Sequence, residues 1–357
     1  MKIKRQDARV GHLVSEDIMG MTSVPLIMKG TVLTDQHIKA LRAFNIQELT
    51  VESAGDLLKA TPPAQQGERD ERKVESTPFL TRYMKSVEDY KKEFVKWQSG
   101  MAVDIAKIRE ILLSVLAEVQ ESPTLIHTVI QVQSKPDYLY HHAMATALLS
   151  MLIGKKLGID DTQSTQLGLG AALSNCGMAK ISSIILKKER PLTEREFSEV
   201  KMHPVHSYKL IKDSPLLKSE TKLAILQHHE RYDGTGYPSR EKGDRVHLYA
   251  QIIGIADIFH AMSSDRLYKT KQPIFKVLDI IRKDHFGQFP PQVVTGLLGL
   301  ISGLSTGTGV RLTSGHQGKV VFTQSHSPTR PIIKLEGSEE LLDLSKQQDV
   351  HIAEVLS

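Results

Sequence analysis

The sequence has a single cysteine, Cys176, and few aromatic residues, which make up 5% of its 357 residues. One cysteine cannot form a disulfide within the chain, as is typical of proteins from a reducing compartment. No apolar run approaches the roughly 18 residues that a membrane-spanning helix needs. The amino-terminal stretch MKIKRQDARVG has no apolar segment typical of a signal peptide. We therefore expect a cytoplasmic protein with no membrane insertion.

A strong charge of one sign is also missing. The net charge is +5 and the isoelectric point is near 9.0, but lysines and arginines are spread along the chain and balanced by acidic residues. The sequence has no basic stripe interleaved with aromatic residues, so we expect no nucleic-acid partner. The excess of positive charge is typical of a solvated surface.

The apolar pattern changes along the chain and predicts a mainly α protein. A length of 357 residues favours two or three compact units. Apolar positions recur at three and four residues between about 79 and 302, which predicts helices, whereas both ends alternate in short runs. The predicted parts are a small β-rich module with one helix at 1–54, a polar linker with paired prolines at 55–78, a helical connector at 79–124, a helical domain at 125–302 and a small β-rich module at 303–357.

Two adjacent histidines, His228 and His229, end an apolar run in ETKLAILQHHERYDGTGYP. The spacing places both on an apolar stripe of a helix that we expect to continue to Asp233-Gly234. Adjacent helical residues point about 100° apart, so both imidazoles can serve one cluster only if it is broad, as with more than one metal ion. The alternative is a pair of hydrogen-bonded core groups.

Three more polar residues lie on apolar helix faces. His142 is in line with apolar residues in HHAMATALLSMLIG, and Asp257 lies on an apolar stripe of IIGIADIFHAMSSD. His203 follows Val200 at helical spacing, on a helix that TEREFSEV opens with the pattern of a capping box. A buried carboxylate needs a cation or several donors, and imidazole and carboxylate together suit iron, manganese or zinc. The residues predict a metal site assembled from separate helices.

These motifs resemble a known family. HHE followed by DGTGYP, with His203-Pro204 upstream and AD followed by SDRLYK downstream, is similar to the HD-GYP branch of the HD phosphohydrolases over roughly residues 125–302. The resemblance implies an all-helical bundle with two or three metal ions, usually iron or manganese. It also implies hydrolysis of the bacterial second messenger cyclic di-GMP.

The resemblance also implies roles for particular residues. The implied metal ligands are His142, His203, His228, His229 and Asp257. Arg266 and Lys269 of SDRLYK match residues that contact the phosphates of the ligand, although a solvated helix end is the alternative. Gly236, Tyr237 and Pro238 match the loop beside the site.

The sequence departs from the family where its name-giving His-Asp pair is expected, because Ser174-Asn175 stands there in ALSNCGM. Neither side chain supplies the anionic bridge between two metals that the resemblance implies. We expect no full dimetal centre and at most one divalent metal ion, iron or manganese with zinc as the other option. Cys176 is a buried thiol on one interpretation and a replacement ligand on another. Pro290 stands where the family often has an aspartate.

The sequence therefore predicts a degenerate HD-GYP protein of cyclic di-GMP signalling. It would have little or no phosphodiesterase activity and would respond to cyclic di-GMP or a related dinucleotide, or bind a protein partner. One alternative is an active metal-dependent phosphodiesterase with a mononuclear or rearranged site. Another is a metal-free interaction scaffold. A homo-oligomer is compatible with the sequence.

Overall fold

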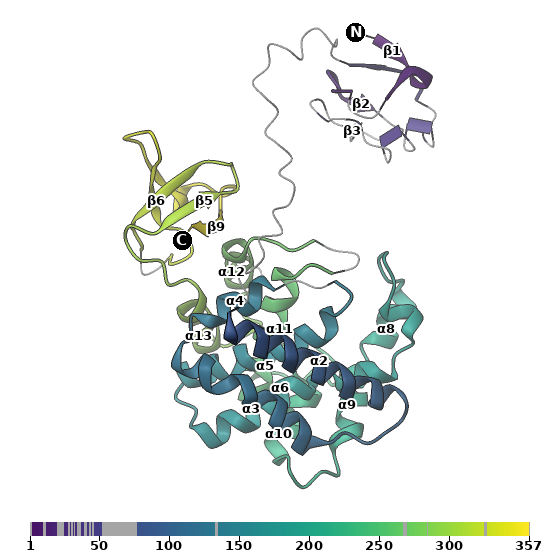
Figure 1. Cartoon of the computed structure of the whole chain (residues 1–357), viewed down its shortest axis with the longest axis vertical. Helices are drawn as coiled ribbons and strands as arrows, with labels where there is room; N and C mark the ends of the chain where they lie inside the picture. Colours follow the sequence, from purple (N-terminus) through teal and green to yellow (C-terminus); the bar gives the residue numbers. More distant parts are fainter. Residues whose placement is uncertain are drawn as a thin grey trace. The chain divides into compact units, whose positions relative to one another are not determined.

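The computed structural model forms two compact units, residues 1–73 and 74–357 (Figure 1). The structure describes residues 2–9, 12–19, 25–27, 29, 31, 33, 37–38, 41–42, 44, 46–51, 77–132, 135–266, 270–283, 285–324 and 327–356. The expected linker at 55–78 lies outside these residues apart from its last two positions. The described helices cannot span a membrane, because none is both long and apolar enough.

The first unit contains short antiparallel strand pairs around a small apolar core. Strand β1 (Lys2–Lys4) pairs with β4 (Glu48–Thr50), and β2 (Ile18–Met19) pairs with β3 (Pro25–Ile27). A 3-10 turn, η1 (Arg5–Asp7), follows β1. Residues 37–38 and 41–42 of the expected helix are helical. The small β-rich module predicted from the alternating pattern is confirmed.

The second unit is mainly helical, as the apolar periodicity predicted. Its helices are α2 (Pro78–Gln98), α3 (Ile105–Glu121), α4 (Leu125–Gln131), α5 (Tyr138–Lys156), α6 (Asp161–Ser174), α7 (Ser183–Leu186), α8 (Glu194–Val200), α9 (His203–Ile211), α10 (Ser219–Gln227), α11 (Leu248–Ser263), α12 (Ile274–Lys283) and α13 (Pro291–Ile301). Two 3-10 turns, η3 (Cys176–Lys180) and η4 (Gly243–Arg245), lie between them. Helix α5 is buried along most of its length and packs against α6 and α11.

Several helices begin where a side-chain oxygen can accept a free backbone N–H. Thr77 accepts from the amide of Leu80 at the start of α2, Asp104 caps α3 and Asp160 caps α6. Such caps typically contribute about 1 kcal/mol each. Helix α2 packs into the same core as the later helices, and its Tyr90 hydroxyl donates to the Ala172 carbonyl at 2.6 Å. The expected helical connector therefore shares its core with the helical domain.

The carboxyl end forms a five-stranded antiparallel sheet in the order β8-β7-β6-β5-β9. The strands are β5 (Gly309–Leu312), β6 (Gln317–Phe322), β7 (Ile332–Leu335), β8 (Leu341–Asp343) and β9 (Ile352–Leu356), with a 3-10 turn, η5 (Leu344–Lys346), after β8. Its apolar face includes Val310 and Ile333 and packs against Phe275 of α12. The predicted second β-rich module is confirmed.

Candidate functional site

Three histidines converge between helices α9 and α10. His203 begins α9, His228 is the C-cap of α10, and His229 follows it. One ligand atom from each lies within 4.8 Å of the others. The rings of His228 and His229 are 4.2 Å apart between centroids, and His203 lies 5.1 Å and 4.9 Å from them. The structure thus brings three of the predicted ligands into one group.

The helix before the histidine pair ends earlier than the sequence pattern predicted. Helix α10 ends at Gln227 rather than continuing to Asp233-Gly234, and the amide of Glu230 donates to the Gln227 carbonyl at 2.7 Å. His228 keeps helical backbone angles and His229 follows in the turn, and both imidazoles still reach one compact group.

The helix that carries His203 also differs from the prediction. The capping box of Thr193 and Glu196 is present, but α8 ends at Val200 and His203 opens the separate helix α9. Pro204 occupies the first turn of α9, where a missing N–H costs no helical hydrogen bond. The break leaves the Val200 carbonyl free to accept from His203 Nδ1 at 2.7 Å.

Backbone carbonyls fix the orientation of two of the imidazoles. His203 Nδ1 donates to Val200 O, and His228 Nδ1 donates to Ile225 O at 2.8 Å. A neutral imidazole carries one proton, so both Nε2 atoms are bare acceptors. They face each other at 3.1 Å. Two lone pairs at this distance repel, and a cation bound to both would satisfy them.

Burial keeps these rings neutral. It lowers the pKa of His203 to about 3 and of His228 to about 4, with further contributions from neighbouring charged groups. Burial also holds the pKa of His229 well below its usual range. Neutral imidazole nitrogens are the form that binds divalent iron, manganese or zinc. The donor set therefore fits a divalent metal ion.

A second group joins α5 to α11. His142 Nε2 lies 2.8 Å from Asp257 Oδ1, and His142 Nδ1 lies 3.0 Å from Nδ1 of His260. Burial raises the pKa of Asp257, but the imidazoles of His142, His229 and His228 outweigh it and hold that pKa well below its usual range. The pKa of Asp257 therefore responds to His228 and His229 as well as to His142. His142 and Asp257 are buried, as their apolar stripes predicted.

His260 is a residue that sequence reasoning missed. It lies one helical turn after Asp257 on α11 and is buried. That spacing of three residues was the available signal, because it places both side chains on one face of a helix.

The Gly236-Tyr237-Pro238 loop packs directly on the histidines. The Tyr237 ring stacks on His229 with centroids 4.7 Å apart and planes 21° from parallel. Gly236 has no room for a side chain, because an ideal Cβ would lie 2.4 Å from Glu230 Cα and 2.5 Å from the His229 carbonyl oxygen. The Glu230 carboxylate accepts from the amide of Ser239 at 2.6 Å and anchors the loop.

Two cations lie over aromatic rings that contact site histidines. The Lys201 ammonium is 5.4 Å from the centroid of Tyr237, which stacks on His229. The Arg266 guanidinium is 5.1 Å from the centroid of Tyr138, which stacks on His142 at 5.2 Å. Lys269, the other predicted phosphate-binding residue, lies outside the described residues.

Ser174 and Asn175 end helix α6 and are both buried. Ser174 Oγ donates to the Ala171 carbonyl at 2.8 Å, and Asn175 Nδ2 donates to Ser174 Oγ at 3.3 Å. The following turn packs on the start of α9, because a Cβ on Gly177 would lie 2.2 Å from the His203 carbonyl oxygen. This pair is therefore next to the helix that presents His203.

Two further departures have structural roles. Cys176 is buried, and burial raises the pKa of its thiol to about 12, which keeps it protonated and favours the interpretation as a packed thiol. Pro290 is the residue immediately before α13 and occupies its N-cap.

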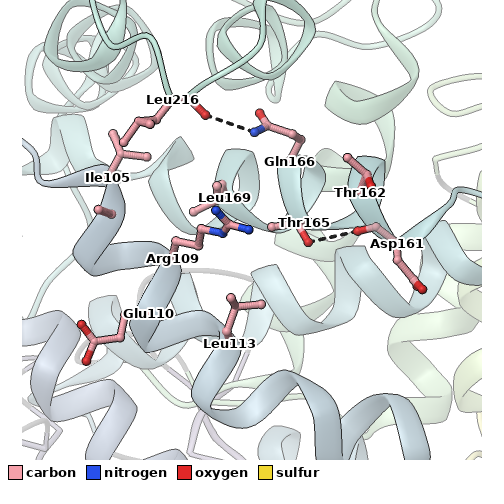
Figure 2. A pocket seen from close by; sticks show the side chains of 11 residues that line it. Ile105, Arg109, Glu110, Leu113, Asp161, Thr162, Thr165, Gln166, Leu169 and Leu216 are labelled. Atoms are coloured by element: carbon pink, nitrogen blue, oxygen red, sulfur yellow. Dashed lines mark hydrogen bonds between the residues drawn. The ribbon is translucent and has the colours of Figure 1, made fainter.

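A cavity of about 720 Å³ lies away from these residues. Figure 2 shows that the N-terminal parts of α3 and α6 and the segment before α10 line it, with the Arg109 side chain among apolar residues such as Leu113 and Leu216. A second cavity, of about 630 Å³, lies on the carboxyl-terminal sheet. The site histidines line neither of these two cavities.

Comparison with known proteins places this geometry in a family. The family model described as an HD domain matches residues 129–292, which contain all the histidines of both groups. A cyclic di-GMP phosphodiesterase of Pseudomonas aeruginosa is 28% identical over 238 residues, covering 66% of this chain and 57% of the relative. The chain contains an HD domain of the HD-GYP family.

Other relatives of this HD-GYP chain cover less of its length. The 3'3'-cGAMP-specific phosphodiesterase 3 of Vibrio cholerae is 32% identical over 166 residues, covering 46% of this chain and 36% of the relative. The chain spans about half the length of the curated relatives it matches, between 36% and 57% for these two. A solved HDG"Y"P protein from Bdellovibrio bacteriovorus has a TM-score of 0.53 at 15% identity and covers 85% of this chain and 99% of the solved one, which supports the fold.

Proposed function

We propose that this protein is a degenerate HD-GYP regulator of cyclic di-GMP signalling, which binds one divalent metal ion and a cyclic dinucleotide with little or no hydrolysis. The observation that carries the proposal is the pairing of an intact three-histidine group with the neutral residues Ser174-Asn175, which lie next to the helix that presents His203. The bare Nε2 atoms of His203 and His228, 3.1 Å apart, would hold the ion together with His229. Asp257, whose pKa His228 and His229 help to lower, would supply negative charge.

The loss of hydrolysis follows from the charge that a two-metal site needs. Two-metal hydrolases hold their ions about 4 Å apart, where they stabilise the attacking and leaving oxygens. Two divalent ions at that distance repel by roughly 15 kcal/mol at an effective dielectric constant of about 20, so an anionic bridge between them matters. Asn175 offers only a neutral amide. A bound single ion would supply positive charge for a phosphate oxygen.

The surroundings of the histidines support a ligand with both rings and negative charge. Lys201 with Tyr237, and Arg266 with Tyr138, each place a cation beside an aromatic ring that contacts a site histidine. Aromatic faces can stack on bases, and the cations can bind phosphates. The names of the relatives, phosphodiesterases of cyclic di-GMP and of 3'3'-cGAMP, agree with this ligand class.

The experiment combines metal analysis, dinucleotide binding and turnover on the purified chain. We expect about one iron, manganese or zinc ion per chain, cyclic di-GMP binding by calorimetry, and no linear dinucleotide product. His228→Ala is expected to lose the ion, whereas His316→Ala, which changes an exposed histidine of the carboxyl-terminal sheet, retains it. Metal-dependent turnover that His228→Ala abolishes would contradict the proposal.

An active phosphodiesterase is the second candidate. The close pair of His142 Nε2 and Asp257 Oδ1 favours it, because this pair would supply two further donors to a rearranged centre. It predicts metal-stimulated release of linear dinucleotide. A metal-free interaction scaffold would show neither metal nor dinucleotide binding.

A further inference from the structure

Both ring nitrogens of His142 have a close partner. Nε2 faces Asp257 Oδ1 at 2.8 Å, and Nδ1 faces His260 Nδ1 at 3.0 Å. The position of the single proton on a neutral His142 decides which partner it meets. With the proton on Nε2, His142 donates to Asp257, and its Nε2 has no lone pair that could bind a metal ion. With the proton on Nδ1, His142 donates to His260, and Nε2 is bare beside the carboxylate.

The second arrangement presents two metal donors together. Two ligand atoms that each lie about 2.1 Å from one ion, with an angle of about 90° between the two bonds, are about 3 Å apart. The distance of 2.8 Å between His142 Nε2 and Asp257 Oδ1 is close to this value. It is also close to the 3.1 Å between the Nε2 atoms of His203 and His228.

His203, His228 and His142 each need an acceptor for the Nδ1 proton, and they find it in different ways. His203 lies where one helix ends and another begins, and His228 lies at a helix end, so backbone carbonyls are available for their Nδ1 atoms. His142 lies inside α5, where the carbonyls of the preceding turn belong to the helical hydrogen bonds. A side chain from another helix must therefore accept its proton.

We propose that His260 is a positioning residue of the metal centre, which accepts the Nδ1 proton of His142 and so leaves His142 Nε2 and Asp257 free to bind the one divalent ion of the proposed function. This inference rests on the proposed function in that it requires the chain to bind a metal. His260 acts through His142.

The surroundings of His260 hold it in this role. The side chain is buried, and its ring stacks near Tyr138, which also stacks on His142. Ser264 Oγ lies 3.3 Å from His260 Nδ1 and 3.4 Å from His260 Nε2, and it can accept the Nε2 proton when Nδ1 is the acceptor for His142. Helix packing between α5 and α11 brings the two rings together.

Two substitutions separate the hydrogen bond from the packing. His260→Phe keeps a ring of similar size but has no acceptor, whereas His260→Gln keeps an acceptor in its amide oxygen. We expect His260→Phe to weaken Mn²⁺ binding by about 10–100-fold, the usual effect of removing the partner of a metal-binding histidine. We expect His260→Gln and the surface control His316→Ala to remain within about threefold of wild type. Calorimetric titration with Mn²⁺ and the visible spectrum of the Co²⁺ form measure these changes on the full chain.

Equal Mn²⁺ binding by wild type and His260→Phe would overturn the inference, as would an equal loss in His260→Phe and His260→Gln. Absence of Mn²⁺ and Co²⁺ binding by the wild type would instead refute the metal site of the proposed function. Nitrogen NMR of the metal-loaded wild type tests the same point if His260→Phe does not fold. A proton on His142 Nδ1 is the expected result, and a proton on Nε2 would overturn the inference.

Discussion

The Nε2 atoms of His203 and His228 face each other at 3.1 Å, and each ring is held by a backbone carbonyl three residues earlier in the chain. The orientation of both rings is therefore set by where helices end, before any ligand binds. Such preorganised donors lose little conformational freedom on binding. The arrangement also leaves two neutral acceptors facing each other inside the protein, which has consequences for stability.

The first consequence is a loss of stability in mild acid when no metal is present. The folded-state pKa values of His203 and His228 are about 3 and about 4, below the ordinary value near 6.5. The unfolded chain therefore takes up protons more readily than the folded chain. The stability that the folded protein has with neutral His203 and His228 is fully present above about pH 6.5 and is lost as the pH falls towards 4.

We expect the free energy of unfolding, measured with urea in the presence of a chelator, to decrease from pH 7 to pH 4.5. His203→Gln should reduce this pH dependence, while the exposed change His316→Ala should leave it unaltered. The prediction would be wrong if His203→Gln and wild type showed the same slope.

The second prediction concerns Gly236, where the loop lies against the backbone of the histidine turn. An added Cβ would come within 2.5 Å of Glu230 Cα, Arg231 N and His229 O. Because backbone atoms cannot move aside cheaply, we expect Gly236→Ala to cost about 1–3 kcal/mol and to displace Tyr237 from His229. Thermal unfolding and dinucleotide binding should both report the change.

Gly299→Ala is the matched control, because a Cβ added to this exposed residue of α13 would meet nothing within 4 Å. It should be neutral or stabilise the chain by up to about 1 kcal/mol. Equal stability of the two variants would show that the loop does not pack as described.

The helical architecture could be predicted from the sequence because the signals for it lie within short segments. The three-and-four spacing of apolar residues predicted the helical region, and the same stripes predicted the burial of His142 and Asp257. Thr193 and Glu196 form the capping box that their spacing indicated. These features depend on residues within one or two turns of each other.

The features that the sequence did not reveal depend on contacts between distant segments. Helix α10 ends at Gln227 although His228 and His229 continue its buried stripe at helical spacing, and the following turn is held by Glu230, which accepts from amides nine and eleven residues later. His260 pairs with a histidine 118 residues away. Local periodicity has no information about such pairings.

The third prediction concerns the buried ion pair between Asp279 of α12 and Arg330, which joins the carboxyl-terminal sheet to the helices. Arg330 Nε donates to Asp279 Oδ2, and its other nitrogens bond to the carbonyls of Leu344 and Gln347. Arg330→Met removes the cation that hydrogen-bonds to the buried Asp279 carboxylate and leaves the longer contact with Arg282 at 4.0 Å, which should cost about 3–5 kcal/mol. Chemical unfolding measures this loss.

Lys334→Met provides the control, since Lys334 forms an exposed pair with Glu339 in the same sheet. Its cost should be within about 0.5 kcal/mol. A small effect of Arg330→Met, similar to that of Lys334→Met, would contradict the role assigned to the buried pair.

The last prediction concerns Asn175, the neutral residue at the end of α6. Asn175→Asp changes one atom and introduces a carboxylate, but it removes the hydrogen bond that Asn175 Nδ2 donates to Ser174 Oγ. A buried carboxylate without a cation is unfavourable, so the metal-free variant should be less stable than wild type. A bound divalent ion would compensate that charge, and an ion that binds only the folded state raises stability by an amount that grows with the logarithm of its affinity. The rise in melting temperature on adding Mn²⁺ should therefore be larger for Asn175→Asp than for wild type, and larger still with Ser174→His if the buried site accepts the ring.

Gln292→Glu adds the same charge on the exposed surface of α13 and should leave the Mn²⁺ response unchanged. If Asn175→Asp and Gln292→Glu respond alike, Asn175 is not beside the metal position, and its neutral amide does not account for a loss of hydrolysis.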